Sequence, residues 1–108
     1  MTDFLHNPHA GEILKSEFLE PLKLSQNALA KAIDVPPNRV HAIVKGTRSI
    51  TADTDLRLSK FFGLSDGYWL RLQTLYELME AKRELLAKLD LIQPYDYPES
   101  QEHAVCKF

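Results

Sequence analysis

The residues of this chain whose types best suit specific binding chemistry lie between positions 38 and 45. They are Asn38, Arg39, His41, Ala42 and Lys45. Asparagine can pair with two groups on an adenine edge, arginine or lysine can pair with guanine, and a bare alanine methyl can contact a thymine methyl. These side chains therefore suit the base edges of a DNA major groove. An ordinary solvated helix face is also polar, so the neighbouring sequence must decide between the two interpretations.

The segment before these residues predicts a short helix followed by a tight turn. Ser25 can cap a helix over residues 26–33 through its hydroxyl. Asp34 stands where this helix stops, because Asp tolerates the left-handed conformation better than most residues. Val35 can fill the angle between two helices, and Pro36–Pro37 supply the fixed φ of a first helical turn. A second helix is therefore expected to start at about residue 37.

Helical spacing divides this second helix, over residues 37–45, into two faces. The apolar face consists of Val40, Ile43 and Val44. Two helices joined by such a turn form a helix-turn-helix, the motif that places its second helix in a major groove. The candidate residues occupy the side away from the apolar face, with Asn38, Ala42 and Lys45 opposite it and Arg39 and His41 on the flanks.

Positive charge is concentrated on the same part of the chain. Residues 22–50 carry five Lys and Arg residues and one acidic residue, a net charge of +4. Residues 1–21 and residues 77–108 each sum to −3 and residues 51–76 to zero, which gives the −2 of the whole chain. Phosphate contacts need positive charge at the binding unit, so this distribution supports DNA binding, although a charged run is often only a solvated face.

Three more helices complete the predicted fold. The first covers about residues 10–20 and ends at Pro21, and the second follows a cap at Thr51 and ends at Gly63. No period-two alternation occurs, so no sheet is expected. Gly46 is expected to end the second helix of the motif and to open a loop over 46–49. The core positions expected on the first two of these helices are Ile13, Leu14, Phe18, Leu58, Phe61 and Phe62.

The last predicted helix, capped by Ser65 and running from Asp66 to about Asp90, carries more apolar surface than one core requires. One side can pack on the other helices. We expect the other side to be buried in a second copy, so that two recognition helices meet major grooves about 34 Å apart. The alternative is that the broad apolar stripe only wraps its own domain. The expected dimer residues are Leu78, Leu85 and Ile92.

These elements predict an all-α fold of five helices with a long C-terminal helix. Its 108 residues, 44% of them apolar, suffice for one core. Residues 1–92 are expected to form a single DNA-binding and dimerisation domain, and residues 93–108 a C-terminal tail.

Five blocks of sequence, in order along the chain, resemble the HigA-type antitoxins, also called virulence-associated protein I, of the repressor/Cro-like helix-turn-helix class. The resemblance covers about residues 9–80 and implies a repressor/Cro-like domain. It also implies a bacterial antitoxin that binds a ribonuclease toxin and represses its own operon. The blocks are HAGEIL at 9–14, FLEPLKLSQNALA at 18–30, VPPNRV at 35–40, GTRSITADT at 46–54 and YWLRLQ at 68–73.

The same resemblance implies roles for single residues. Gln26 matches a position that anchors a backbone phosphate and braces the recognition helix, although a polar residue in a first helical turn needs no such role. Arg48 matches a phosphate contact, and the plain alternative is a solvated loop charge. The positions that match phosphate contacts are Gln26, Thr47, Arg48 and Ser49, and those that match base-facing positions are Asn38, Arg39 and Ala42, with His41 beside them.

The chain departs from the family pattern at three positions. Ala10 stands where the family has proline, Lys23 where it has a glycine between two leucines, and Asp34 where it has the turn glycine. Lys23 can add a phosphate contact, and Asp34 costs a little backbone strain. None of the three lies on the predicted recognition face.

Other chemistries find little support in the sequence. There is no Gly-rich phosphate loop, nucleophile elbow or paired-carboxylate arrangement, so neither an enzyme nor a cofactor is expected. Among His6, His9, His103 and Cys106, only the last two have local spacing, and no metal site is expected. A single cysteine excludes an intramolecular disulfide. No run approaches the roughly 20 apolar residues of a membrane span and no signal peptide is evident, so the expected location is the cytoplasm.

The predicted function is that of an antitoxin in a bacterial type II toxin–antitoxin system. Such a protein binds double-stranded operator DNA as a homodimer, represses its operon and neutralises a ribonuclease toxin. The acidic ends of the chain could attract a basic ribonuclease. Two alternatives remain open: a stand-alone or prophage repressor without a toxin partner, and a protein-interaction scaffold that has lost DNA binding.

Overall fold

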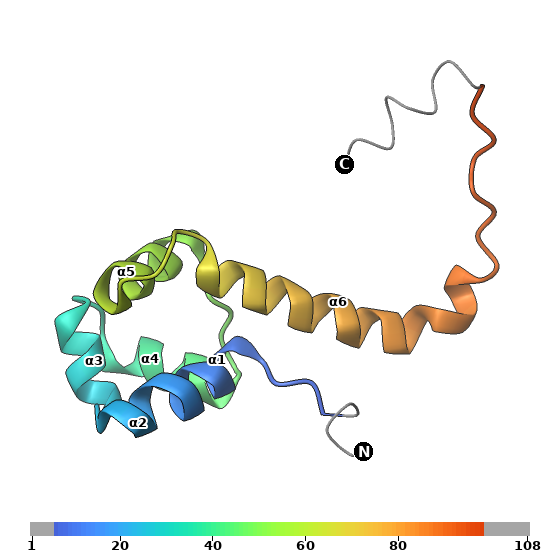
Figure 1. Cartoon of the computed structure of the whole chain (residues 1–108). Helices are drawn as coiled ribbons and strands as arrows, with labels where there is room; N and C mark the ends of the chain where they lie inside the picture. The colour runs from blue at the N-terminus through green and yellow to red at the C-terminus, as the bar shows by residue number, and fades with distance from the viewer. Residues whose placement is uncertain (1–5, 99–108) are drawn as a thin grey trace.

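The computed structural model of the chain describes residues 6–98, and these form an all-helical fold with no strand among them (Figure 1). The five predicted helical segments are present, which confirms the fold class. The first segment is divided into three elements because its middle is a π-helix. In chain order the elements are α1 Ala10–Ile13, η2 Leu14–Leu19, α2 Glu20–Leu22, α3 Gln26–Ala32, α4 Pro37–Lys45, α5 Ala52–Phe62 and α6 Tyr68–Leu89.

The first helical segment runs through Pro21 rather than ending there, which corrects the sequence prediction. A proline ring in an α-helix clashes with the carbonyl four residues earlier, and the wider π turn lies directly before it. The wider turn also changes which side chains share a face: Leu14 and Leu19, five residues apart, are both buried. The segment ends at Lys23, whose left-handed φ of 54° stands where the family pattern has glycine.

The turn between α3 and α4 follows the predicted chemistry. The Ser25 hydroxyl accepts a hydrogen bond from the backbone N–H of Ala28 at 3.0 Å and so caps α3. Asp34 is left-handed, with a φ of 60°, and Val35 is buried in the angle between the two helices. Gly46 ends α4 with a φ of 90°. Each of these local predictions is confirmed.

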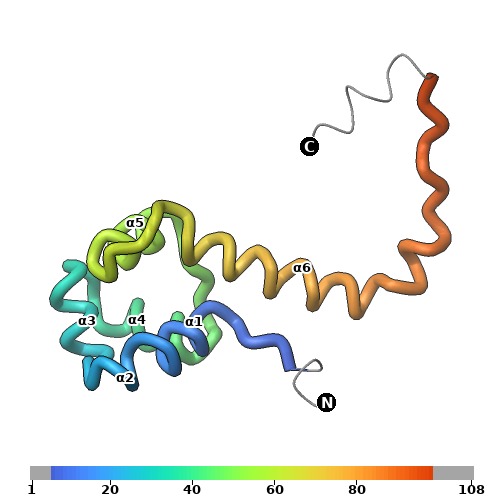
Figure 2. Tube along the Cα trace, viewed as in Figure 1, coloured from blue at the N-terminus to red at the C-terminus, as the bar shows by residue number. Residues whose placement is uncertain are grey.

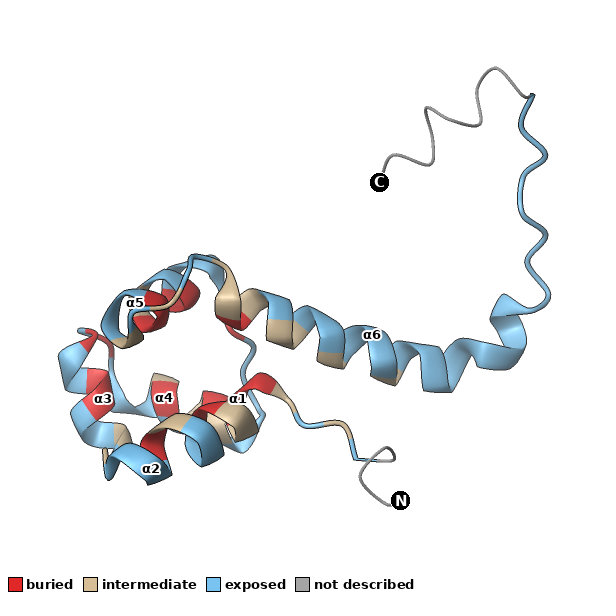
Figure 3. Cartoon of the chain, in the orientation of Figure 1, coloured by how far each residue is buried: buried red, intermediate tan, exposed pale blue. Residues whose placement is uncertain are grey.

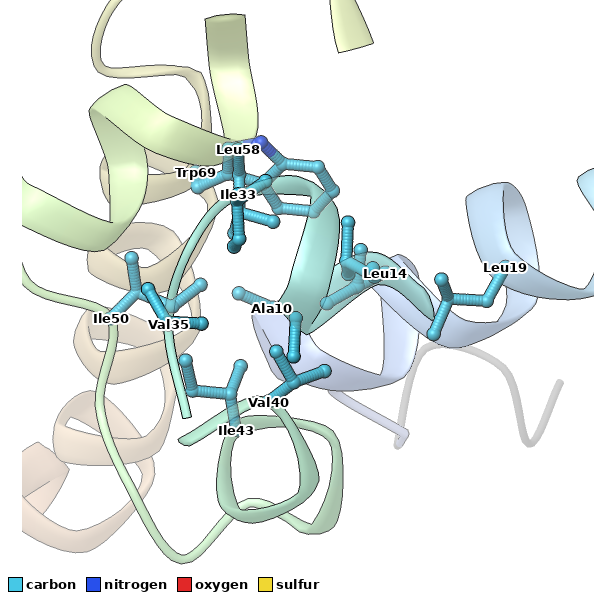
Figure 4. Packing of buried hydrophobic residues seen from close by; sticks show 12 residues of the cluster. Ala10, Leu14, Leu19, Ile33, Val35, Val40, Ile43, Ile50, Leu58 and Trp69 are labelled. Carbon is cyan, nitrogen blue, oxygen red and sulfur yellow. The ribbon is translucent and has the colours of Figure 1, made fainter. Parts of the chain in front are cut away.

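The hydrophobic core lies between α1 to α5 and the first turns of α6. Figure 4 shows Ala10 of α1 facing Val40 and Ile43 of α4, with Trp69 of α6 above them. The backbones of α1 and α4 approach closely at Gly11, where an added Cβ would lie 1.9 Å from the Ile43 carbonyl oxygen. Only glycine fits this crossing, so the position of α4 against α1 is set by residue 11.

The start of α6 is held by a side chain from α5, not by Ser65 as the sequence suggested. The carboxylate of Asp55, itself buried, accepts hydrogen bonds from the backbone N–H groups of Gly67 at 2.6 Å, Trp69 at 2.8 Å and Leu70 at 3.1 Å. These N–H groups have no partner inside the helix, and the carboxylate also suits the positive end of the helix dipole. Asp55 therefore fixes the direction in which α6 leaves the other helices.

Beyond its first turns, α6 leaves the other helices, and its surface is exposed (Figure 3). The leucines predicted to face a second copy, Leu78 and Leu85, are 53% and 40% exposed in the single chain. Asp90 and Leu91 form a turn at the end of the helix, and residues 92–98 continue from it without helix or strand (Figure 2). The sequence prediction that Phe61 belongs to the core is wrong, since this ring is 43% exposed, whereas Leu58 is buried as predicted.

Candidate nucleic-acid interface

The outer face of α4 presents the predicted polar stripe to solvent. Asn38, His41 and Lys45 are exposed, and Ala42 between them is half-buried. On the inner side, Val40 and Ile43 are buried in the core. The helix is therefore fixed from behind by apolar packing while its polar side stays open. No other part of residues 6–98 covers Asn38, and this openness is the steric condition that groove binding requires.

Arg39 differs from the other candidates because its side chain is engaged within the molecule. Its guanidinium Nη1 lies 2.9 Å from Oδ2 of Asp53 in the first turn of α5. Asp53 also accepts from Nε of Arg57 at 3.1 Å. The hydrogen bond from Arg57, the largest cause, and the charges of both arginines hold the pKa of Asp53 below its ordinary value of 3.8. Asp53 thus stays ionised and paired near neutral pH.

Arg57 extends this contact to the turn of the motif. Its Nη1 donates to the carbonyl oxygens of Ile33 at 2.8 Å and Asp34 at 3.3 Å, at the end of α3. These carbonyls have no helical partner of their own because the helix stops there. One network of Arg39, Asp53 and Arg57 therefore ties α4, α5 and the turn together.

A second polar contact links α4 to the start of α3. Nε2 of His41 lies 3.0 Å from Oδ1 of Asn27. Gln26, the neighbour of Asn27 and the predicted phosphate-binding residue, is half-buried at the first position of α3. The start of α3 and the exposed face of α4 are thus held next to each other, as a surface that spans a groove and its phosphates requires.

The loop after α4 holds the other predicted phosphate-contacting residues. Thr47, Arg48 and Ser49 are all exposed. The Thr47 hydroxyl donates to the Ala42 carbonyl at 3.3 Å, which completes the end of α4. The end of the loop is fixed by Gln73 of α6, whose side-chain amide donates to the Ile50 carbonyl at 2.9 Å and accepts from the Ile50 N–H at 2.5 Å. The loop is therefore braced by the long helix.

The sequence did not reveal the supporting residues Asp53, Asp55, Arg57 and Gln73 in these roles. Both aspartates lie in the first turn of α5, where an acidic residue already has a local explanation in the helix dipole, so the sequence gives no sign of their contacts with distant elements. The only sequence signal for Gln73 was its place in the YWLRLQ block. Apart from the Asp53–Arg57 pair, which has the four-residue spacing of a helix, their partners are 12 to 24 residues away along the chain, so helical spacing alone does not identify them.

The described residues offer little to other kinds of site. Within residues 6–98, no group of three or more His, Cys, Asp and Glu side chains is arranged to hold a metal ion. The same part of the chain contains no helix with both the length and the apolar composition to cross a membrane. His103 and Cys106, the pair considered for a metal, lie outside the described residues.

Comparison with known proteins identifies the class of this fold. Residues 16–69, which include α3, the turn and α4, match the family described as helix-turn-helix. The chain is 50% identical over 76 residues to virulence-associated protein I of Dichelobacter nodosus, a match that covers 70% of each chain. The protein is therefore a member of the helix-turn-helix class.

Two solved structures place it more closely. A HigA-family addiction module antidote protein from Coxiella burnetii is 46% identical, with a TM-score of 0.77 over 83% of this chain and 99% of that one. The Pseudomonas aeruginosa antitoxin HigA, solved with the higBA promoter, is 36% identical, with a TM-score of 0.78 over 84% of this chain and 100% of that one. The chain belongs to the HigA-type helix-turn-helix antitoxins, as its sequence blocks predicted.

Proposed function

We propose that this protein is the antitoxin of a type II toxin–antitoxin system, which binds operator DNA as a homodimer, represses its own operon and neutralises a ribonuclease toxin. The observation that carries the DNA-binding part is the exposed stripe of Asn38, His41 and Lys45 on a helix whose other side is buried. The promoter bound to the Pseudomonas relative supports the same interpretation. Protection mapping of the region upstream of the gene tests it, since a symmetric protected site is the expected result.

Base reading by α4 is assigned to Asn38, Arg39, His41, Ala42 and Lys45. Asn38→Ala and Arg39→Ala are each expected to weaken operator binding by about 1–3 kcal/mol and to relax the sequence preference at one base pair. Glu17→Ala, an exposed change in η2, is the matched control. Unchanged operator affinity in the double variant Asn38→Ala/Arg39→Ala would argue against groove reading by α4, and absence of operator binding by the original protein would favour the protein-interaction scaffold.

Phosphate contacts are assigned to Gln26, Thr47, Arg48 and Ser49. Arg48→Ala is expected to weaken binding to every DNA sequence alike, because a phosphate contact carries no base information. It should also reduce the slope of log affinity against log salt concentration by about one. A loss confined to the operator sequence would instead assign Arg48 to base reading.

Dimer formation is assigned to Leu78 and Leu85 of α6 and to Ile92, which the sequence predicted on the same helix but which lies beyond its end at Leu89. Apolar side chains left in water on a protruding helix and just after it are an unfavourable arrangement for an isolated chain. Leu85→Glu is expected to shift the protein to monomer in sedimentation velocity and to weaken operator binding. Leu56→Glu places the same charge on an exposed leucine of α5 and serves as the control. A Leu85→Glu variant that remains a dimer would exclude this face.

Toxin neutralisation is proposed from family membership and from the acidic charge of residues 77–108. The expected neighbour of the gene encodes a small basic ribonuclease that co-purifies with this protein. Without such a gene the protein is better described as a stand-alone or prophage repressor. Co-purification with a chain truncated after Ile92 then separates the proposed domain of residues 1–92 from the tail of residues 93–108. Retained binding would exclude the tail as the main toxin contact.

The proposals on catalysis, cofactors and location follow from a function that consists only of binding DNA and a toxin. We propose that the protein is not an enzyme, needs no cofactor and acts in the cytoplasm, where operator DNA is found. Binding that is unaffected by a chelator such as EDTA would support the absence of a required metal.

A further inference from the structure

The loop over residues 46–49 contains most of the assigned phosphate contacts but has little packing of its own. Thr47, Arg48 and Ser49 are exposed, so none of their side chains is packed in the core. A cavity of about 70 Å³ lies between the loop and the elements behind it, α1 and α6. The conformation of the loop is therefore set mainly at its two ends, where it joins the rest of the molecule.

At its second end the loop joins Ile50, whose backbone is held on both sides by the side chain of Gln73. The Gln73 amide accepts a hydrogen bond from the Ile50 N–H and donates one to the Ile50 carbonyl oxygen at 2.9 Å. This N–H belongs to the planar peptide group that follows Ser49, so its hydrogen bond sets the direction in which the loop arrives. Burial of the Ile50 side chain fixes where the residue lies but not how its peptide groups are turned.

Gln73 can position the loop because α6 is itself held on both sides of this residue. Figure 1 shows the chain between α4 and α5 running past the first turns of α6. One turn before Gln73, Trp69 is buried in the core. One turn after it, the ring of Tyr76 lies edge-on to the ring of His9, with centroids 5.9 Å apart. The carbonyl oxygen of Tyr76 also accepts a hydrogen bond from the side-chain amide of Asn7 at 2.9 Å.

We propose that Gln73 is a positioning residue for DNA binding, which holds the loop over 46–49 in the conformation in which Arg48 contacts a phosphate. Gln73 acts through its two hydrogen bonds with Ile50 and not through a contact of its own with DNA. The inference rests on the DNA-binding function proposed above and deepens it. It makes the affinity for DNA depend on α6, a helix outside the helix-turn-helix motif.

Gln73→Met tests this role, because it keeps the length of the side chain and removes both hydrogen bonds. We expect it to weaken binding to operator and to random DNA alike, by roughly tenfold in fluorescence anisotropy. The slope of log affinity against log salt concentration should fall by about one, as for Arg48→Ala. Thr74→Ala, an exposed change at the next position of α6, is the matched control and should change neither quantity.

The salt dependence separates positioning from a loss of folded protein. A variant that is only less stable has less active protein, but the molecules that bind still make the same phosphate contacts and keep the same slope. An unchanged slope for Gln73→Met would therefore overturn the proposal. So would an increase in the dimer Kd as large as the loss of DNA affinity, because the effect would then come from dimerisation.

A double-mutant cycle shows whether Gln73 acts through Arg48. Because the two residues serve the same contact, Gln73→Met should weaken binding by less than about threefold in an Arg48→Ala background. In an Asn38→Ala background, where the recognition face is changed instead, Gln73→Met should keep its effect of roughly tenfold. Equal effects of Gln73→Met in both backgrounds would overturn the proposal.

Hydrogen exchange in the original protein gives a test that does not depend on the folding of a variant. The Ile50 N–H should be strongly protected, since it is hydrogen-bonded to Gln73, and rapid exchange at this position would overturn the proposal. Failure of the original protein to bind operator DNA would overturn the DNA-binding function together with this inference. Operator binding that Arg48→Ala weakens and Gln73→Met leaves unchanged would overturn the inference alone.

Discussion

Replacing Asp55 is expected to be among the most damaging single changes in this protein. Its carboxylate accepts three backbone N–H groups at the start of α6 and is almost fully buried. Hydrogen bonds to a charged group contribute about 1.5–3 kcal/mol each, and contributions that share one carboxylate do not simply add. Asp55→Ala removes the acceptor and leaves these N–H groups away from water, so a loss of about 3–5 kcal/mol is expected. This is a large fraction of the 5–15 kcal/mol that typically stabilises a small domain.

The assay is urea unfolding followed by the fluorescence of the single tryptophan, Trp69, which is buried beside the cap. Asp55→Asn keeps the shape but replaces one acceptor oxygen by an NH2 group, and should lose about 2–3 kcal/mol. Asp66→Ala, an exposed aspartate in the same turn, should change stability by less than about 0.5 kcal/mol. An Asp55→Ala variant within about 1 kcal/mol of the original protein would refute the view that this carboxylate holds α6.

Three further changes test the backbone and the ion pairs. Gly11→Ala should destabilise by about 1–3 kcal/mol in urea unfolding because its Cβ would clash with the Ile43 carbonyl, and an unchanged midpoint would contradict that close approach. Lys23→Gly and Asp34→Gly should each add about 0.5–1 kcal/mol by relieving a left-handed backbone, and a loss at either position would argue against the strain. Asp53→Asn should be less stable than the original protein near neutral pH. This difference in stability should vanish as the pH falls below 3.8 and through the lowered pKa of Asp53, because protonation removes the same charge from the original protein. A difference in stability that persists at such low pH would show that the loss of this charge is not its cause.

The sequence predicted those structural features that depend only on residues close together in the chain. Ser25 and Thr51 cap their helices through hydrogen bonds to residues three positions away, and Gly46 ends α4 in the left-handed conformation. Each of these features depends on a few consecutive residues, so a residue type in a known position suffices to predict it. The open face of α4 was predicted on the same basis, from the spacing of Val40 and its apolar neighbours.

The features that the sequence missed depend on contacts between distant parts of the chain. Leu19 was not expected in the core because the inward position follows from the wide π turn before Pro21 and not from regular helical spacing. The pairing of Arg39 with Asp53 joins two helices through side chains 14 residues apart. Asp55 similarly reaches across to a helix whose start was assigned to Ser65. Rules for capping and helical spacing do not identify such contacts, because several nearby residues fit those rules equally well.

The pairing of Arg39 with Asp53 has a consequence for how the protein would search DNA. To bind a guanine, Arg39 would first have to break its ion pair with Asp53. On DNA without that guanine, Arg39 would remain paired with Asp53. Breaking the ion pair is then a cost that only the complex with the right sequence bears, so the aspartate would lower affinity for that sequence and leave binding to random DNA nearly unchanged. The strength of this pair in the unbound molecule would thus set how much the arginine adds to discrimination between sequences.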